Sequence, residues 1–128
     1  MKFLLDTHVF LWAIGAPAKL SAKAAALLTD EANQLMVSVA SLWEIVVKKQ
    51  AGKLELPATA EYFRAHMSQL GVGEVLAIQP SHIYRLNELP IDHKDPFDRL
   101  LIVQCQVERL VLVSADPIMR RYAIEAVW

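Results

Sequence analysis

The chain opens with Lys2-Phe3-Leu4-Leu5-Asp6-Thr7-His8, and this stretch decides the fold. Three consecutive apolar residues followed at once by an acid have the length and composition of a short buried strand. A helical pattern over residues 7–14 begins directly after Asp6. In open α/β sheets, ligands bind outside the carboxyl ends of the strands. The stretch therefore predicts an α/β sheet with Asp6 at its functional edge.

The rest of the chain alternates the same two kinds of element. Further strands are predicted at residues 35–39, 75–78 and 110–113, and an edge strand at 124–128. Further helices are predicted at residues 22–31, 40–51, 59–70, 80–89 and 95–108, and a short one after Pro117. This alternation predicts a central, mostly parallel β-sheet flanked by helices on both faces. No linker or repeat interrupts the pattern, so we expect one domain spanning residues 1–128.

Composition narrows the possible functions. The formal net charge is −1, so any surface that binds nucleic acid must be local. No apolar run approaches the roughly 18 residues that span a bilayer, and no signal-peptide pattern is found, so we expect no membrane contact. The only cysteine, Cys105, cannot form an internal disulfide, which fits the cytoplasm. The high hydrophobic fraction, 55 %, indicates surface that serves a partner or a dimer contact.

Four acids are expected to meet at the carboxyl edge of the sheet. Asp6 and Asp116 each follow a strand. Glu44 lies one turn into a helix, and Asp98 lies in the first turn of another. Carboxylates this close raise one another's pKa, and a divalent cation relieves their repulsion. Mg²⁺ and Mn²⁺ take oxygen ligands, and such a metal activates water for phosphodiester hydrolysis.

Histidine and cysteine are not arranged for zinc. The chain has one cysteine, and its histidines are scattered at positions 8, 66, 82 and 93. We expect His8 to pack or cap rather than to coordinate a metal. We expect His93 to be a loop residue with local hydrogen bonds.

Four motifs, in order, carry a resemblance to a known family. They are Leu4-Leu5-Asp6-Thr7-His8; Ser38-x-x-Ser41-x-Trp43-Glu44-Ile45 with Lys48 and Gly52-Lys53-Leu54; His93-x-Asp95-Pro96-Phe97-Asp98-Arg99-Leu100-Leu101; and Val113-Ser114-Ala115-Asp116. Together they resemble the PIN-domain family over nearly the whole chain, and their residue sequence is similar to that of VapC-type toxins of type II toxin–antitoxin pairs. Each motif alone is weak, but four in the correct order are specific.

The resemblance implies a fold, an activity and partners. It implies a PIN-like α/β fold and a Mg²⁺- or Mn²⁺-dependent endoribonuclease that cleaves single-stranded RNA, often in structured molecules such as tRNA. It also implies a VapB-like antitoxin and a homodimer. By position, the family's four catalytic and metal-binding acids match Asp6, Glu44, Asp98 and Asp116. The family often has Thr where this chain has Ser114, and the hydroxyl is retained.

Several of these polar residues have a structural alternative. Asp95, an extra acid of the third motif, either shares the metal or caps the helix that follows. Glu44 also has the spacing to pair with Lys48 at i,i+4. Three hydroxyls either cap helices or position water or a phosphate: Thr7, Ser38 and Ser114.

Basic residues follow two of the acids. They are Lys48, Lys49, Lys53, Arg120 and Arg121. They form either a solvated face or a rim that contacts RNA phosphates beside the acids.

Two other functions fit an acid after the first strand. A haloacid-dehalogenase-like phosphotransfer enzyme would use Asp6 as nucleophile, but the second acid of that family's motif is missing from Asp6-Thr7-His8. A non-enzymatic receiver-like module would hold Mg²⁺ for signalling, but it needs paired acids after the first strand and a lysine after the last, and neither is in place.

Overall fold

The computed structural model describes residues 1–128 and is built on one five-stranded sheet. Its strands are β1 (Lys2–Leu5), β2 (Gln34–Ser38), β3 (Val72–Leu76), β4 (Val111–Val113) and β5 (Ala126–Val127). They lie in the order β3-β2-β1-β4-β5, and every neighbouring pair is parallel. The predicted fold class is confirmed.

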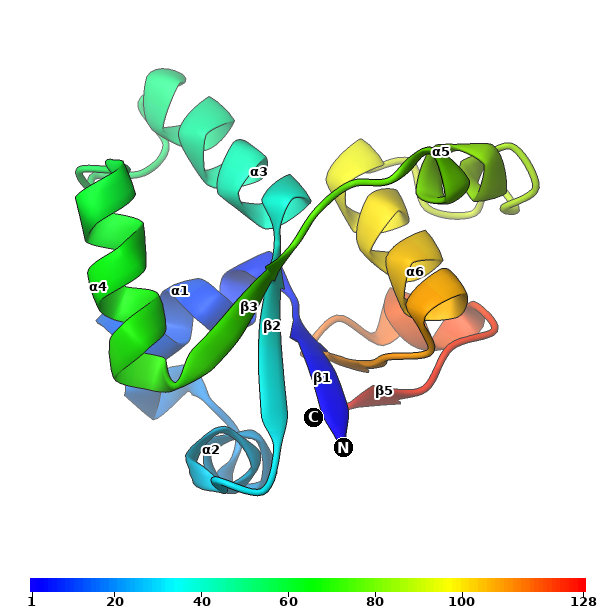
Figure 1. Cartoon of the computed structure of the whole chain (residues 1–128). Coiled ribbons are helices and arrows are strands. Elements are labelled where there is room, and N and C mark those ends of the chain that lie inside the picture. The colour runs from blue at the N-terminus through cyan, green and yellow to red at the C-terminus, as the bar shows by residue number, and fades with distance from the viewer.

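Helices connect the strands and cover both faces of the sheet (Figure 1). They are α1 (Thr7–Gly15), α2 (Ala22–Thr29), α3 (Val39–Gln50), α4 (Ala60–Leu70), α5 (Pro80–Leu86) and α6 (Pro96–Glu108), with short 3₁₀ helices η1 (Pro17–Lys19) and η2 (Pro117–Arg121). In Figure 1, α1, α2 and α4 lie on one side of the sheet and α5 and α6 on the other, and α3 lies beyond the carboxyl end of β2. None of these helices has the length and apolar character needed to cross a lipid bilayer.

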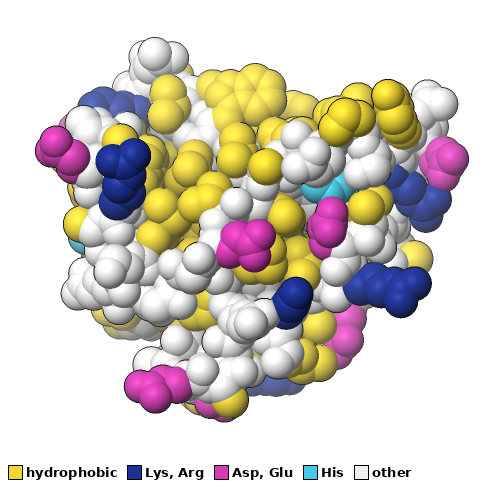
Figure 2. Space-filling view, in the orientation of Figure 1, with side chains coloured by type: hydrophobic (Ala, Val, Ile, Leu, Met, Phe, Trp, Pro, Cys, Tyr) yellow, Lys and Arg dark blue, Asp and Glu magenta, His cyan; other side chains and the backbone are white.

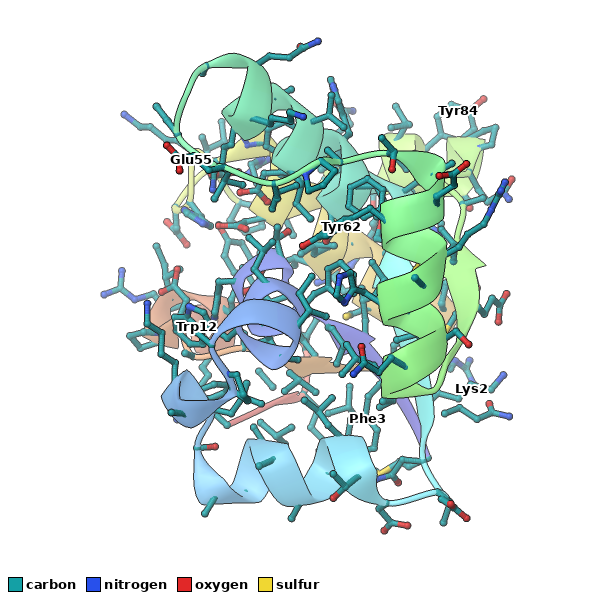
Figure 3. All side chains as sticks on the ribbon, turned by 90° about the vertical axis from the view of Figure 1, so that its left-hand side faces the viewer. Lys2, Phe3, Trp12, Glu55, Tyr62 and Tyr84 are labelled. Carbon is teal, nitrogen blue, oxygen red and sulfur yellow. The ribbon has the colours of Figure 1, made fainter.

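Strand β1 supplies residues to two separate cores. Phe3 and Leu5 pack in the cluster of α1, α2 and α4, whereas Leu4 packs with Leu112 in the cluster that contains the buried apolar residues of α6. This division follows from the alternation of side chains along a strand. Figure 3 shows Phe3 inside the layer beside α2, with Lys2 pointing away from it. Because both faces of β1 are covered, the strand is central, as its apolar run predicts.

The predicted boundaries hold best where a side chain caps a helix. The hydroxyls of Ser21 and Thr59 accept hydrogen bonds from the backbone of α2 and α4, and Gly71 ends α4 at φ 75°. Asp6, rather than Thr7, caps α1, and Thr7 is the first helical residue. The predicted helices at 22–31 and 80–89 end earlier, at Thr29 and Leu86.

The third strand lies earlier in the chain than predicted. It spans Val72–Leu76 instead of 75–78. The prediction followed the apolar residues, but the strand includes Gly73 and Glu74, whose residue types are depleted in strands. β3 is an edge strand with mostly exposed side chains, so its position is set by backbone pairing with β2 rather than by burial.

The strand order reverses beside β1. The chain places β2 and β3 on one side of β1 and then crosses to place β4 on the other. A reversal of strand order between neighbouring strands is where open α/β sheets bind ligands. The backbone N–H of Asp6 donates to the Val113 carbonyl at 3.0 Å, so β1 and β4 end side by side there.

A buried amide joins α6 to the end of β2. Gln104 is fully buried, and its Oε1 accepts a 2.6 Å hydrogen bond from the Ser38 hydroxyl. Its Nε2 donates to the Ala77 carbonyl at 3.3 Å. Because Asp98 lies in the first turn of α6, this contact helps to fix the helix that carries that acid.

We expect Gln104→Leu to lower the free energy of unfolding by about 1–3 kcal/mol, because it removes the acceptor for the buried Ser38 hydroxyl proton and the donor to the Ala77 carbonyl. Urea denaturation measures this. The matched control is Gln106→Leu on the same helix, where a bond to exposed Arg85 is lost instead. Equal losses for the two variants would show that the buried amide has no special role.

Candidate metal centre

Asp6 is held firmly at the carboxyl end of β1. Its side chain is 2 % exposed. Oδ1 accepts a 2.7 Å hydrogen bond from the Thr7 backbone, and Oδ2 accepts a 2.6 Å bond from the Ser114 hydroxyl. Burial raises the pKa of Asp6, the nearby His8 and the two hydrogen bonds act to lower it, and the charge of Glu44 raises it further. The ionised carboxylate is therefore well oriented but lacks sufficient countercharge.

The loop after β4 is fastened to the end of β1. The Ser114 hydroxyl donates to Asp6 and accepts from the Asp116 backbone N–H at 3.1 Å. The Ala115 N–H donates to Nε2 of His8 at 3.1 Å, and Nδ1 of the same ring lies 3.4 Å from Asp6 Oδ2. Since Nε2 is an acceptor, neutral His8 carries its proton on Nδ1, facing Asp6. These bonds set the spacing between Asp6 and Asp116.

Glu44 contributes a buried oxygen without a partner. The residue is 4 % exposed, and its Oε2 accepts from Lys48 Nζ at 2.6 Å. Its Oε1 is buried and makes no hydrogen bond. Burial acts to lower the pKa of Lys48, but the bond to Glu44 and the charges of Glu44, Asp95 and Asp98 raise it overall. A buried carboxylate oxygen left unpaired is costly, which points to a missing positive ligand at this oxygen.

Asp98 shares an electrostatic environment with the other acids. Burial and the charges of Asp6, Asp95 and Glu44 raise the pKa of Asp98 to about 7, against the lowering effect of a hydrogen bond from His93. That bond joins Nε2 of His93 to Oδ2 of Asp98 at 2.6 Å. Asp6, Glu44 and Asp98 are therefore close enough to repel one another.

Three side chains bring ligand atoms together at this edge. One ligand atom each from His93, Asp98 and Asp116 lies within 4.8 Å of the other two. With the unpaired oxygen of Glu44, this donor set fits a divalent cation, which would supply the countercharge that the acids lack. Two of the four predicted acids, Asp98 and Asp116, lie in this cluster, whereas Asp6 and Glu44 lie outside it and act on Asp98 through their charges.

Other predicted site residues use their side chains within the fold. Thr7 and Ser41 are buried and hydrogen-bonded to each other at 2.9 Å. The Ser38 hydroxyl accepts from the Ala40 N–H and donates to Gln104. Asp95 caps α6, where its Oδ1 accepts from the backbone of Phe97 and Asp98. The capping alternative is therefore observed for Ser38 and Asp95.

The basic residues divide into two groups. Lys48 is tied to Glu44, and Nζ of Lys49 donates to the Pro57 carbonyl at 2.8 Å. The remaining three are exposed and form no ion pair within the chain: Lys53, Arg120 and Arg121. Only these three are free to meet an anionic ligand without breaking an existing contact.

Two histidines lie closer to the acids than their scattered positions suggest. His8 faces Asp6, and His93 faces Asp98. The expectation of a merely local loop residue was incomplete for His93, since its partner belongs to the acid cluster. The one sequence signal for it is its position five residues before Asp98. By contrast, a cavity of about 600 Å³ is lined mainly by α1, α2 and α4 and contains none of the four acids.

We expect Asp98→Asn to stabilise the metal-free protein at pH 8, by up to about 4 kcal/mol at 1.36 kcal/mol per pKa unit. The pKa of Asp98 is raised from 3.8 to about 7, so its charged form is disfavoured in the folded state, and stability falls as pH rises between these values. The gain should therefore fall to less than half of its pH 8 value at pH 5. Thermal unfolding at both pH values, with EDTA, measures it.

The matched control for that measurement is the exposed Asp92→Asn, which should change stability little at either pH. A variant Asp98→Asn that is destabilised at pH 8 would show that the acids do not repel one another.

Solved structures share this fold along almost the entire chain. VapBC2 from Rickettsia felis, bound to a DNA fragment from its promoter, is 15 % identical, with TM-score 0.69, covering 99 % of this chain and 98 % of the matched chain. VapBC-1 from nontypeable Haemophilus influenzae is 16 % identical, with TM-score 0.66 and coverages of 99 % and 97 %. A toxin–antitoxin complex from Klebsiella pneumoniae is 18 % identical, with TM-score 0.64 and coverages of 98 % and 95 %.

At such identities the likeness concerns the fold. A comparison with curated proteins gave no match. The sequence itself, however, matches the PIN domain family over residues 3–125, a range that contains all four acids. This match agrees with the parallel sheet and with the acids gathered at its carboxyl edge. The chain therefore belongs to the PIN domain family.

Proposed function

We propose that this protein is a metal-dependent endoribonuclease, the VapC-like toxin of a type II toxin–antitoxin pair that acts in the cytoplasm. The observation that carries the proposal is the unpaired, buried Oε1 of Glu44 beside other acids at the strand reversal. A site that concentrates negative charge and leaves a buried oxygen unsatisfied is built to receive a cation.

The four acids Asp6, Glu44, Asp98 and Asp116 would hold Mg²⁺ or Mn²⁺. Bound there, the metal supplies an activated water and stabilises the charge that develops on the phosphate during phosphodiester hydrolysis. The Ser114 hydroxyl orients the Asp6 carboxylate through its 2.6 Å bond. Lys48 holds one oxygen of Glu44 and leaves the other free. Asp95 fixes the first turn of α6, in which Asp98 lies.

RNA is the proposed substrate, in keeping with the cation and with the exposed basic residues. Lys53 follows α3, which carries Glu44, and Arg120 and Arg121 lie on η2, which begins right after Asp116. With a net charge of −1, this local placement is where phosphates would meet positive charge. Structured RNA such as tRNA presents the single-stranded loops that ribonucleases of this kind would cleave.

The toxin assignment is supported by the structural neighbours. The three solved structures named above are VapBC or toxin–antitoxin complexes. A VapB-like antitoxin is therefore the proposed protein partner.

Exposed apolar residues recur every fourth position on α3, at Val39, Trp43 and Val47, and Figure 2 shows apolar side chains gathered over α3 and α5. Such a patch favours a protein contact, which supports the proposed homodimer.

We expect Asp6→Asn and Glu44→Gln each to lower the rate of RNA cleavage at least about 100-fold, because the proposed metal contributes several kcal/mol to the transition state. Cleavage of end-labelled RNA measures this. EDTA should abolish the wild-type activity, and added Mg²⁺ or Mn²⁺ should restore it. The control is Glu55→Gln, which changes an exposed acid outside the site.

Other outcomes would favour the competing functions. Cleavage that proceeds equally fast in Asp6→Asn would reject the proposed site. Phosphate transferred covalently to Asp6, without RNA cleavage, would indicate a phosphotransfer enzyme or a receiver-like module. Both oxygens of Asp6 already accept hydrogen bonds in a buried position, which disfavours a nucleophilic role.

We also expect expression of the wild-type chain to arrest bacterial growth and expression of Asp6→Asn to leave growth unchanged. Co-expression of a small DNA-binding protein encoded by the neighbouring gene should relieve the arrest. Growth curves, with both variants expressed to equal levels, measure this. Toxicity that persists while the neighbour's product is stably bound would count against the toxin assignment.

A further inference from the structure

The acid cluster includes a histidine, His93, in addition to the predicted carboxylates. Its ligand nitrogen and one oxygen each of Asp98 and Asp116 lie within 4.8 Å of one another. Metal ligands bound at about 2.0–2.2 Å lie at most roughly 4.4 Å apart, so only small side-chain movements separate this group from a coordinating one. Asp6 and Glu44 act on Asp98, one member of this group, through their charges.

Hydrogen bonds with two other side chains hold the backbone of His93 on both sides. Its N–H donates to the Tyr122 hydroxyl at 2.7 Å, and its carbonyl accepts from Arg99 at 3.2 Å. The same guanidinium nitrogen also donates to the Pro90 carbonyl at 2.8 Å. These bonds fix the backbone on both sides of the atom that carries the imidazole. Preorganised ligands of this kind are what a metal site requires.

The His93 imidazole and the Asp98 carboxylate contact each other directly. Nε2 and Oδ2 are 2.6 Å apart, so in the metal-free chain they share a proton. A divalent ion that displaces this proton would meet an imidazole nitrogen and a carboxylate oxygen at once. Support for a cation close to this group comes from Glu44, whose charge acts on Asp98 and whose buried Oε1 has no hydrogen-bond partner.

We propose that His93 is itself a metal ligand, binding through Nε2 together with Asp98 and Asp116, and that this nitrogen gives the site a preference for Mn²⁺ over Mg²⁺. This inference rests on the proposed metal-dependent function of the same site. Mg²⁺ is a hard cation that favours an all-oxygen shell. First-row transition ions accept imidazole nitrogen more readily, so a mixed shell shifts selectivity towards them.

The test compares binding of Mn²⁺ alone and Mg²⁺ alone to the full chain and to His93→Gln. Glutamine retains an amide that can still hydrogen-bond Asp98, but it lacks the imidazole nitrogen. Titration calorimetry should show that the variant loses at least about tenfold in Mn²⁺ affinity. Its Mg²⁺ affinity should change much less. If His93 only orients Asp98, the glutamine variant will bind Mn²⁺ as the wild type does, and the inference is overturned.

A spectroscopic readout identifies the nitrogen directly. Pulsed EPR of bound Mn²⁺ should show modulation from a coordinated ¹⁴N nucleus in the wild type, and His93→Gln should abolish it. His8→Gln is the matched control, because His8 is the other histidine that contacts an acid of the cluster. The signal should persist in that control. Loss of the signal in His8→Gln but not in His93→Gln would assign the nitrogen to His8 and reject the inference.

The inference and the proposed function fail in different ways. A wild-type chain that binds neither Mg²⁺ nor Mn²⁺ contradicts the proposed function, and the inference with it. A chain that binds both metals and cleaves RNA, with no nitrogen signal and equal losses of the two affinities in His93→Gln, contradicts the inference alone.

Discussion

The hydrogen bond from Ser114 to Asp6 is the contact on which the rest of the site depends. It joins two residues 108 positions apart in the chain, across the ends of the parallel strands β1 and β4. Because both strands are buried and fixed in register by the two cores, their ends meet without freedom to shift. The hydroxyl also receives the Asp116 N–H, so one oxygen sets the positions of two acids. The pairing of β1 with β4 thus determines where the carboxylates of Asp6 and Asp116 lie.

That geometry costs stability in the metal-free chain. Burial and neighbouring charge raise the pKa of both Asp6 and Asp98, and an oxygen of Glu44 stays unpaired. Lys48 relieves only part of this repulsion, because it contacts one oxygen of one acid. The strain is offset by apolar burial elsewhere, along β1 and α6. A structure that tolerates such repulsion at one edge is stabilised when a cation binds there, since binding to the folded state alone increases its stability.

The sequence predicted the elements that burial or a cap defines. The central position of β1 follows from Phe3, Leu4 and Leu5, and the starts of α2 and α4 follow from Ser21 and Thr59. The acids at the strand ends were predictable because parallel strands share one carboxyl edge. The start of β3 was not, since it lies at an exposed edge where Val72 and Glu74 pair with β2 across an irregularity at Gly73 and leave no apolar pattern. Backbone hydrogen bonds at an exposed edge place almost no constraint on residue type, so they cannot be predicted from the side chains.

The polar contacts inside the site show the same limit at a finer scale. The residue types of Ser38 and Thr7 are equally compatible with a helix cap and with a ligand. Only tertiary packing determines that their hydroxyls hydrogen-bond to Gln104 and Ser41. His93 is the sharpest case. Its environment is set by a backbone bond to Tyr122, a residue 29 positions later that no local pattern connects with it. A loop residue held by partners this distant in the sequence cannot be recognised from sequence spacing, and neither can the nitrogen that its imidazole places beside Asp98.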